Sequence, residues 1–277
     1  MTSARFEGKN VIVTGGSRGI GRGIVDAFVE EGARVFVVDI LPDGLQRLLA
    51  EHPQADALET FVCDMGDVDA VRAMVREAVA RMGEVHVLVN NAGVQPEGWA
   101  KDFTPEAFDV CMAVNARGPF FAMQELCNGW VSRGTAGSIV NITSANAFKN
   151  ESPESVYNAS KAALGALTNA FAHEYGRYGI RVNAVAPGET ITPEAEAELA
   201  ANPDERRLVR EYLRRIPLQH TGVPRDQAMA VLFLAGDDAR FVSAQTLIVD
   251  GGELGGGDWY DVADAPPLPP EDRPITG

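Results

Sequence analysis

Short runs of consecutive apolar residues alternate along this chain with longer stretches in which apolar residues recur every three or four positions. Unbroken apolar runs are typical of strands buried on both faces of a parallel sheet, and the longer period is typical of helices. The runs predict strands near residues 10–14, 34–39, 58–63, 85–90, 138–142, 180–185 and 246–250. The periodic stretches predict helices near residues 19–31, 43–51, 67–82, 104–131, 156–177, 193–213 and 225–236. This alternation predicts an α/β fold with helices over both faces of a parallel sheet.

The length of the chain allows one or two domains. Its 277 residues show no linker-like break in the strand–helix alternation, so we expect one domain over residues 1–252. Residues 253–277 are rich in proline and acidic side chains, which predicts an irregular tail. Trp259 and Tyr260 in this tail are large apolar groups, and we expect them to pack onto the domain or onto a neighbouring subunit.

The composition of the chain indicates where the protein is located and which classes of molecule it binds. The chain has no apolar run long enough to span a bilayer, and its polar start does not resemble a signal peptide. Its three cysteines have no CxxC spacing and its four histidines have no metal-like spacing, so we expect a reducing compartment and no metal site. The formal net charge of −15 disfavours nucleic acid and anionic membrane surfaces. We expect a cytoplasmic protein that binds a small-molecule substrate.

A glycine-rich loop follows the first predicted strand. The strand NVIVT precedes GGSRGIG, residues 15–21, and a helical pattern follows. Glycines let the backbone approach a pyrophosphate, and a helix N-terminus offers unpaired N–H groups and partial positive charge. The next strand ends in Asp39, eighteen residues beyond Gly21, where a carboxylate can bind the ribose hydroxyls of adenosine. The spacing TGxxxGxG differs from the standard GxGxxG, but strand, loop and acid together predict dinucleotide binding.

A tyrosine and a lysine lie one helical turn apart in the second half of the chain. Tyr157 and Lys161 are at positions i and i+4, so they share one face of the predicted helix. A nearby ammonium group favours the phenolate, so we expect Lys161 to lower the pKa of Tyr157 and to make it an acid–base group. Ser144, thirteen residues before Tyr157, can donate a hydrogen bond to the same substrate oxygen. Such a pair can arise by chance, and its weight comes from the glycine loop upstream.

The candidate residues follow the ends of several predicted strands. Ligands of a doubly wound sheet bind beyond the carboxyl ends of its strands, at the point where the strand order reverses. We therefore expect one rim of the sheet to bring together Gly15, Asp39, Asp64, Asn90, Ser144 and Pro187.

Together these motifs resemble the classical short-chain dehydrogenases/reductases over about residues 5–252. The matching segments are TGxxxGIG at 14–21, Asp64 after FVC, NNAG at 90–93, Asn115 in MAVNARGPF, Ser144, YxxxK at 157–161, Asn183, Pro187-Gly188, Thr192 and QTLIVDGG. The resemblance implies a single-domain Rossmann-type, doubly wound, seven-stranded parallel sheet in the order 3-2-1-4-5-6-7. It also implies an NAD(P)-dependent oxidoreductase acting on CH–OH donors, assembled as a homotetramer or dimer. Ala244 departs from the family pattern, which usually has glycine there.

The resemblance assigns catalytic and cofactor-binding roles. The implied catalytic residues are Asn115, Ser144, Tyr157 and Lys161. Lys161 is also expected to hydrogen-bond the nicotinamide ribose, and Asn115 to hold a water that connects Lys161 to solvent. The residues implied to bind the cofactor, besides Tyr157 and Lys161, are Gly15, Ser17, Arg18, Gly19, Ile20, Gly21, Asp39, Asp64, Met65, Asn91, Ala92, Gly93, Pro187, Gly188, Thr190 and Thr192.

Two charged residues favour different nicotinamide cofactors. Asp39 can accept hydrogen bonds from the ribose hydroxyls, and it would repel the 2′-phosphate of NADP. Arg18 can pair with that phosphate, whereas Ile40 adds no second positive charge. Because a like-charge contact at close range is strongly unfavourable, we expect NAD, with NADP less favoured.

Polar residues near the predicted catalytic set indicate the substrate. The candidates are Gln95, Ser144, Asn146, Glu151 and Glu189, and residues 192–218 are a predicted lid. Acceptors of this kind suit a sugar, a polyol or a cyclic alcohol. One alternative is a reductase of a hydrophobic ketone or a 3-oxoacyl substrate, although the negative charge of the chain disfavours an acidic carrier protein. Further alternatives are a non-catalytic dinucleotide sensor, a methyltransferase, and an extended-type epimerase or dehydratase.

Overall fold

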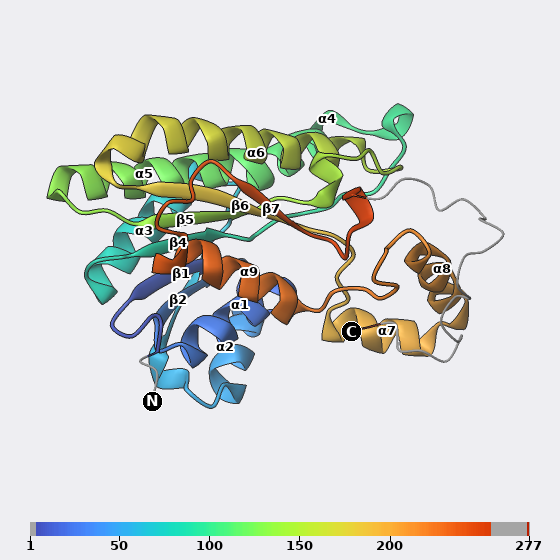
Figure 1. The fold of residues 1–277 in the computed structure, drawn as a ribbon, viewed down its shortest axis with the longest axis horizontal. Coiled ribbons are helices and arrows are strands. Elements are labelled where there is room, and N and C mark those ends of the chain that lie inside the picture. The colour runs from blue at the N-terminus through green and yellow to red at the C-terminus, as the bar shows by residue number, and fades with distance from the viewer. Residues whose placement is uncertain (1–3, 256–275, 277) are drawn as a thin grey trace.

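The computed structural model describes residues 4–255 and 276 and contains a seven-stranded parallel sheet (Figure 1). The strands are β1 (Asn10–Thr14), β2 (Arg34–Asp39), β3 (Leu58–Val62), β4 (Val87–Asn90), β5 (Ser138–Ile142), β6 (Arg181–Pro187) and β7 (Thr246–Val249). Their order in the sheet is β3-β2-β1-β4-β5-β6-β7. This order confirms the predicted doubly wound α/β fold. It reverses between β1 and β4, which is where such sheets bind ligands.

Helices cover both faces of the sheet. They are α1 (Gly19–Glu30), α2 (Pro42–Glu51), α3 (Val68–Met82), α4 (Pro105–Met112), α5 (Gly118–Arg133), α6 (Ser155–Tyr175), α7 (Pro193–Ala201), α8 (Pro203–Leu213) and α9 (Pro224–Ala235). Helices α1, α2 and α9 pack on one face, and α3, α5 and α6 pack on the other (Figure 1). Successive strand residues point to opposite faces, so Val11 and Val13 join one apolar cluster and Ile12 joins the other. Burial on both faces explains why the strands are unbroken apolar runs.

The predicted helix over residues 104–131 contains a π-helical turn. Helix α4 continues into a π-helix, Ala113–Arg117, and then into α5. Asn115 lies at the centre of this turn and is fully buried. π-Helical turns are frequent at functional sites. Apolar periodicity does not reveal one widened turn, because the helix keeps the same buried face on both sides of it.

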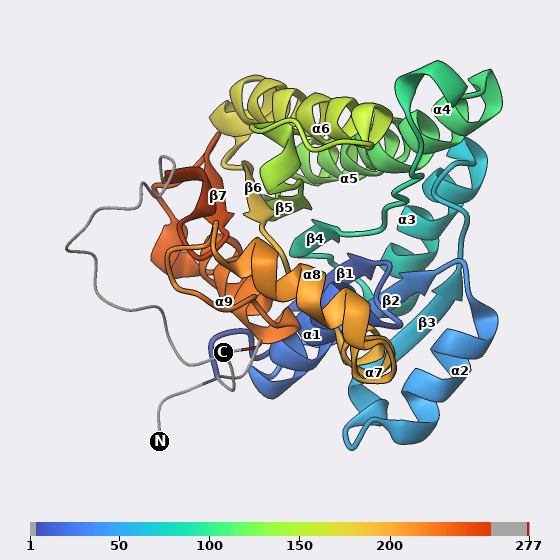
Figure 2. The same ribbon diagram turned by 90° about the vertical axis from the view of Figure 1, so that its right-hand side faces the viewer.

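The prediction of one continuous helix over residues 193–213 was wrong. Helix α7 ends at Ala201 and α8 begins at Pro203, with Asn202 between them in an extended conformation (φ −124°, ψ 94°). A residue that precedes proline is restricted to extended conformations, so the helix breaks at this point. Helices α7 and α8 lie beyond one end of the sheet, and Figure 2 shows them in front of the strands. They make up most of the predicted lid.

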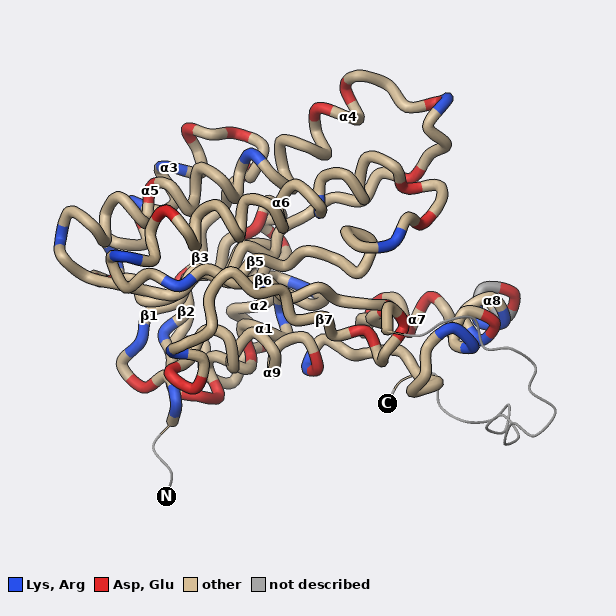
Figure 3. Tube along the Cα trace, turned by 45° about the horizontal axis from the view of Figure 1, so that its top comes forward, with Lys and Arg blue, Asp and Glu red and all other residues tan. Residues whose placement is uncertain are grey.

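Most of the predicted tail lies outside the described residues, and Trp259 and Tyr260 lie there with it. The described part begins with a 3-10 helix, Glu253–Gly255, and Thr276 forms a bridge with Thr221. Within residues 4–255, none of the helices is long and apolar enough to cross a membrane. Figure 3 shows acidic residues around the molecule and several basic residues on α8.

Candidate active site

A cavity of about 480 Å³ lies where the predicted site residues follow the strands. Its wall contains three of the predicted catalytic side chains, those of Ser144, Tyr157 and Lys161. The other predicted residues that line it are Ile20, Asn91, Gly93, Gln95, Asn146, Glu151, Pro187, Gly188, Glu189 and Thr190. Residues from the start of α1, the loops after β4, β5 and β6, and the start of α6 therefore meet around one space.

Helix α6 carries Tyr157 and Lys161 on one face. Lys161 Nζ lies 5.7 Å from the centre of the Tyr157 ring and donates a hydrogen bond to the carbonyl oxygen of Ile142 (2.9 Å). Ser144 follows β5, and its Oγ accepts a hydrogen bond from the backbone N–H of Asn146 (3.1 Å). A further hydrogen bond joins the Ser144 and Tyr157 hydroxyl groups. The arrangement places a serine, a phenol and a cation next to one another in the cavity wall.

The pKa of Tyr157 is shifted in the direction opposite to the expected one. Burial of the phenol raises this pKa, the hydrogen bond to Ser144 lowers it, and the charge of Glu154 raises it further. Burial also lowers the pKa of Lys161, to about 8. The helical spacing did bring the two side chains together, but the lost hydration of a buried phenolate outweighs the attraction of the ammonium group. The prediction that the pKa of Tyr157 is lowered is therefore wrong.

Asn115 ties the π-helical turn to the loop after β4. Its Oδ1 accepts from the Val94 backbone N–H and its Nδ2 donates to the Val94 carbonyl oxygen, both at 2.8 Å. Nδ2 also donates to Ser160 Oγ (2.9 Å). A Cβ atom added to Gly93 would lie 3.2 Å from Lys161 Nζ and 3.3 Å from Asn115 Oδ1, so glycine leaves these two groups close together. Asn115 stands behind the cavity wall and positions this loop, and the water assigned to it stays a prediction.

Hydrogen bonds fasten the glycine loop to the NNAG segment. Asn91 Nδ2 donates to the carbonyl oxygens of Thr14 and Gly15, both at 2.9 Å. The backbone N–H groups of Asn91 and Ala92 donate to Thr14 Oγ1 (3.0 and 3.1 Å). A Cβ atom at Gly21 would overlap the Gly15 carbonyl oxygen, so glycine is required for this close approach. The loop therefore keeps its backbone open to a pyrophosphate.

The start of α1 has the features of an anion-binding site. Its N-cap residue, Arg18, makes no side-chain capping bond, and the first turn, which begins at Gly19, contains no acidic residue. The first N–H groups of the helix are thus left for a ligand, and the helix dipole favours a negative one. Ser17 Oγ is buried and has no hydrogen-bond partner within the described part of the chain. A phosphate oxygen would satisfy it, so these residues fit a dinucleotide pyrophosphate.

The Asp39 carboxylate is fixed beside the glycine loop. Its Oδ2 accepts from the Ser17 backbone N–H and its Oδ1 from the Leu41 backbone N–H, both at 3.1 Å. Each carboxylate oxygen keeps a further lone pair with which it can accept from a ribose hydroxyl. Arg18 is exposed at the neighbouring start of α1, and Ile40 is 56 % exposed. The carboxylate and the guanidinium group thus flank the same end of the loop.

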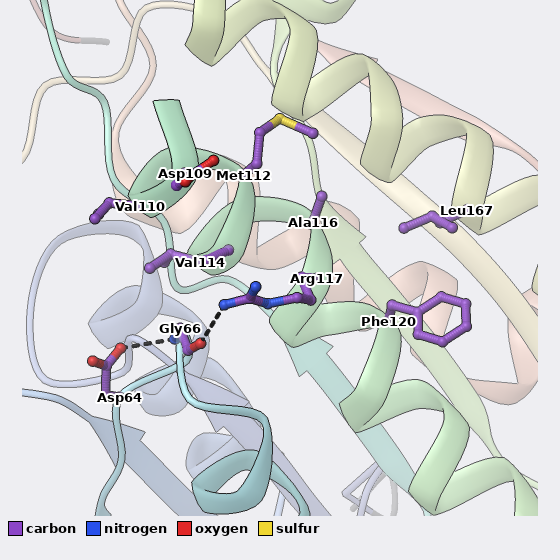
Figure 4. Close-up of a pocket in the computed structure, with 11 residues that line it drawn as sticks. Asp64, Gly66, Asp109, Val110, Met112, Val114, Ala116, Arg117, Phe120 and Leu167 are labelled. Carbon is purple, nitrogen blue, oxygen red and sulfur yellow. Dashed lines mark hydrogen bonds between the residues drawn. The ribbon is translucent and has the colours of Figure 1, made fainter. Parts of the chain in front are cut away.

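Asp64 lies outside the wall of this cavity. Its Oδ1 accepts from the Gly66 backbone N–H (2.7 Å), and it lines a second, larger cavity of about 770 Å³ beside the helical turns between α4 and α5 (Figure 4). Arg117 donates to the Gly66 carbonyl oxygen in that cavity (2.9 Å). Met65, the next predicted cofactor residue, is buried. The larger cavity contains none of the predicted catalytic side chains.

The loop after β6 joins the sheet to the lid. Thr190 Oγ1 donates to the Gly188 carbonyl oxygen (3.0 Å) and accepts from the buried Gln227 Nε2 (3.1 Å). Thr192 caps α7 by accepting a hydrogen bond from a backbone N–H of its first turn. A Cβ atom at Gly19 would lie 3.3 Å from the Thr192 methyl carbon. The lid therefore begins directly against the glycine loop.

Several predicted substrate residues are already engaged by other side chains of the cavity wall. Gln95 Nε2 and Asn146 Nδ2 both donate to the carboxylate of Glu154, at 2.6 and 2.8 Å. Glu151 pairs with Lys149 (3.4 Å). The side chains singled out from the sequence therefore do lie in the wall, but Glu154 holds two of them in place.

The contact between Lys149 and Glu253 was not predicted from the sequence, which placed Glu253 in the tail. Lys149 Nζ donates to Glu253 Oε1 (2.6 Å) and to the Tyr212 hydroxyl oxygen (2.8 Å), and Tyr212 donates to the same Glu253 oxygen (2.7 Å). These side chains come from the loop after β5, from α8 and from the segment after β7. Because Lys149 and Glu253 are 104 positions apart, no local pattern announces their contact. The network ties the lid to the rest of the wall.

Known proteins resemble this chain over most of its length. A family model described as enoyl-(acyl carrier protein) reductase matches residues 15–253. Glucose 1-dehydrogenase of Gluconobacter oxydans (strain 621H) is 36% identical over 250 residues, which cover 90% of this chain and 92% of that protein. Sorbitol dehydrogenase of Cereibacter sphaeroides is 34% identical over 254 residues, with coverage of 90% and 98%. The crystal structure of levodione reductase matches with a TM-score of 0.84 and 33% identity, covering 91% of this chain and 100% of that one. The chain therefore belongs to the classical short-chain dehydrogenase/reductase family of NAD(P)-dependent oxidoreductases.

Proposed function

We propose that the protein is an NAD-dependent oxidoreductase that interconverts a secondary alcohol and a ketone. The observation that carries the proposal is the single cavity wall shared by Ser144, Tyr157 and Lys161. Gly93 and the loop after β6 line the same space, and the glycine loop with its unpartnered Ser17 hydroxyl group adjoins it. When bound, the nicotinamide supplies or accepts the hydride.

The three side chains divide the proton chemistry between them. Tyr157 accepts the hydroxyl proton of the substrate during oxidation and returns it during reduction. Ser144 orients the same substrate oxygen and stabilises the negative charge that develops on it. Lys161 stabilises the phenolate by its charge and, as we propose, hydrogen-bonds the nicotinamide ribose. Asn115 keeps the NNAG loop in position beside Lys161 and holds the water through which the lysine exchanges protons with solvent.

The Asp39→Asn variant is expected to lose most of its preference for NAD. The ratio of kcat/KM for NAD to that for NADP should exceed one in the wild type and fall about 10-fold or more in the variant. The substitution removes the carboxylate that repels a 2′-phosphate, while Arg18 remains to pair with it. Steady-state kinetics with both cofactors measures the ratio. Asp64→Asn removes a carboxylate at the end of the neighbouring strand and should leave the ratio nearly unchanged; an equal change in both variants would contradict the role of Asp39.

A sugar, a polyol or a cyclic alcohol is the substrate class that we propose. The cavity wall is rich in carboxylate and amide groups, which suit a substrate with several hydroxyl groups. Two relatives are named for the sugar glucose and the polyol sorbitol, and a third for levodione. The description of the matching family model favours an acyl carrier protein substrate instead. The net charge of −15 and the acidic wall oppose that alternative, because the carrier is itself acidic.

A substrate screen that follows the absorbance of reduced nicotinamide tests the proposal. NAD and NADP are each offered with sugars, polyols, cyclic alcohols, steroids and hydroxyacyl thioesters. We expect turnover with NAD and with hydroxyl-rich alcohols. Turnover confined to steroids or thioesters would contradict the substrate class. Binding of NADH without turnover of any alcohol would favour the sensor alternative.

We propose that the protein is a homo-oligomer, either a dimer or a tetramer. Large apolar side chains are exposed on and beside the edge strand β7 and helix α9: Met229, Phe233, Phe241, Leu247 and Ile248. An apolar patch next to a sheet edge favours coverage by a second copy of the chain. Light scattering should give the mass of two or four subunits, and the mass of one subunit would contradict the proposal. The cysteines at positions 63, 111 and 127 are free and buried, which supports the cytoplasmic location that we propose.

A further inference from the structure

The wall of the catalytic cavity carries more carboxylates than cations. The acids are Glu151, Glu154, Glu189 and, directly behind Lys149, Glu253, whereas the cations are Lys149 and Lys161. No group of these acids, or of other described residues, has the arrangement needed to hold a metal ion that would offset their charge. An anionic substrate would therefore meet net repulsion in this cavity, and an uncharged one would not.

The cationic donors of the wall are already engaged by the protein. Lys149 donates hydrogen bonds to Tyr212 and Glu253, and its charge is also paired with the carboxylate of Glu151. Lys161 donates to a backbone carbonyl oxygen of β5. A carboxylate or phosphate on a substrate would thus find no spare cation at Lys149. The wall offers a substrate acceptors rather than charged donors.

Glu189 is the carboxylate in the wall whose acceptor capacity is unused. Glu154 accepts from two amide groups, and Glu151 pairs with Lys149. Within residues 4–255 and 276, no side chain or backbone N–H forms a hydrogen bond or ion pair with the Glu189 carboxylate. The Glu189 side chain lines the cavity but is exposed to solvent. Partial loss of hydration raises its pKa, and the charges of Glu151 and Glu253 raise it further, against the opposing effect of Lys149. Both carboxylate oxygens are therefore open to a hydrogen-bond donor of a ligand.

The backbone around Glu189 is held on both sides. Its carbonyl oxygen accepts from the Gly222 backbone N–H (2.9 Å), and the preceding Gly188 N–H donates to the carbonyl oxygen of Val249 (2.9 Å). A Cβ atom at Gly188 would lie 2.6 Å from the Cα of Asp250, so this part of the loop packs tightly on the segment after β7. The backbone that carries the Glu189 side chain is therefore fixed beside the cavity.

We infer that Glu189 is a specificity residue that accepts hydrogen bonds from donor groups of the substrate. The inference rests on the proposed function and narrows its substrate class. The favoured substrates are uncharged alcohols that carry at least one hydroxyl group besides the reacting one. Hydroxy acids are disfavoured, because their carboxylate would face Glu189 and its acidic neighbours without a free cation.

The test compares wild type with Glu189→Gln on two matched pairs and one simple alcohol. The pairs are cyclohexane-1,2-diol with 3-hydroxycyclohexanecarboxylate, and D-glucose with D-glucuronate; cyclohexanol provides a single hydroxyl group. In the wild type, kcat/KM should be higher for the neutral member of a pair than for the acid, and higher for the diol than for cyclohexanol. Glu189→Gln keeps the size of the side chain but removes its charge. KM for the neutral member should rise about 10-fold with little change in kcat, and discrimination against the acid should fall by a similar factor.

Two further variants distinguish recognition of the substrate by Glu189 from the general effect of removing one negative charge from the protein. Glu194→Gln removes the same charge from an exposed position on α7 and should behave as the wild type. Glu189→Asp keeps the carboxylate and should restore discrimination against the acid. An unchanged KM and discrimination in Glu189→Gln, or equal wild-type kcat/KM for the diol and cyclohexanol, would overturn the inference and leave the proposed function standing. Failure of the wild type to oxidise any alcohol while it binds NADH would overturn the proposed function and this inference with it.

Discussion

Replacing Tyr157 with phenylalanine is expected to lower kcat/KM by about 10²–10⁴-fold, the range typical of a lost acid–base group. The Tyr157 hydroxyl group is hydrogen-bonded to Ser144, and its ring lies 5.7 Å from the Lys161 ammonium group. The variant keeps the ring and loses only the hydroxyl group, so the affinity for NADH should change little. Steady-state kinetics gives kcat/KM, and a fluorescence titration with NADH gives Kd.

Tyr175→Phe is the matched control on the same helix. Its hydroxyl group donates to Asn128 Oδ1 (3.1 Å), away from the cavity wall. We expect this variant to keep the kinetics of the wild type. Retention of more than a tenth of the activity in Tyr157→Phe would overturn the acid–base assignment. Loss of NADH binding in that variant would indicate instead that the ring itself supports the cofactor site.

The parallel sheet and the convergence of the site were predictable from the pattern of apolar residues, whereas the strand order was implied by the resemblance to a known family. Strands buried on both faces are unbroken apolar runs, and residues that follow parallel strands must meet at one end of the sheet. Gly93 and Ser144 follow β4 and β5, Pro187 ends β6, and all three line one cavity. The break between α7 and α8 was not predicted, although the sequence carries a signal for it, because Pro203 restricts the residue before it.

Other parts of the site were not predictable, for two physical reasons. Contacts between distant positions, such as Lys149 with Glu253, depend on how loops fold back and leave no periodic signal. The direction of a pKa shift depends on the balance of burial and charge, and spacing reports only the charge. The i, i+4 pair therefore placed Tyr157 correctly beside Lys161 but gave the wrong sign for the pKa of its phenol.

The position of Tyr157 beside Lys161 and the raised pKa of its phenol together indicate how the site works. A buried phenol with a raised pKa is a stable neutral donor, and it becomes a base when positive charge offsets the cost of its ionisation. The charge available in the wall beside it is that of Lys161, because Lys149 is engaged with Glu253 and Tyr212. Lys161 should therefore matter to the chemistry as much as the tyrosine does.

Lys161→Met is accordingly expected to lower kcat/KM by at least about 10²-fold. The substitution removes the charge that favours the phenolate and the group that we propose binds the nicotinamide ribose. KM for NAD should therefore rise as well, which distinguishes this variant from Tyr157→Phe. Kinetics at varied NAD concentration measures both effects. An unchanged KM for NAD would contradict the ribose contact, and a kcat close to the wild-type value would contradict the role of the charge.

The same variant should change how stability depends on pH. Burial lowers the pKa of Lys161 from 10.5 to about 8, so between these pH values the unfolded chain binds more protons than the folded protein. The free energy of unfolding of the wild type should therefore rise with pH over this interval. Below pH 8 the buried ammonium group costs on the order of 3 kcal/mol, and this cost disappears once the lysine is neutral in both states.

Lys161→Met lacks this titration, so it separates the charge of the lysine from its packing. The Ile142 carbonyl oxygen loses its donor in the variant at every pH, and that loss adds a constant to the difference in stability. The difference in the free energy of unfolding between wild type and variant should also change with pH. As the pH rises from 8 to 10.5, the wild type should gain stability relative to the variant by on the order of 3 kcal/mol. Urea denaturation of both proteins at the two pH values, without nucleotide, measures this change. A difference that stays constant with pH would mean that the ammonium group remains hydrated in the folded protein, and the phenol would then lack the concentrated charge that the proposed chemistry requires.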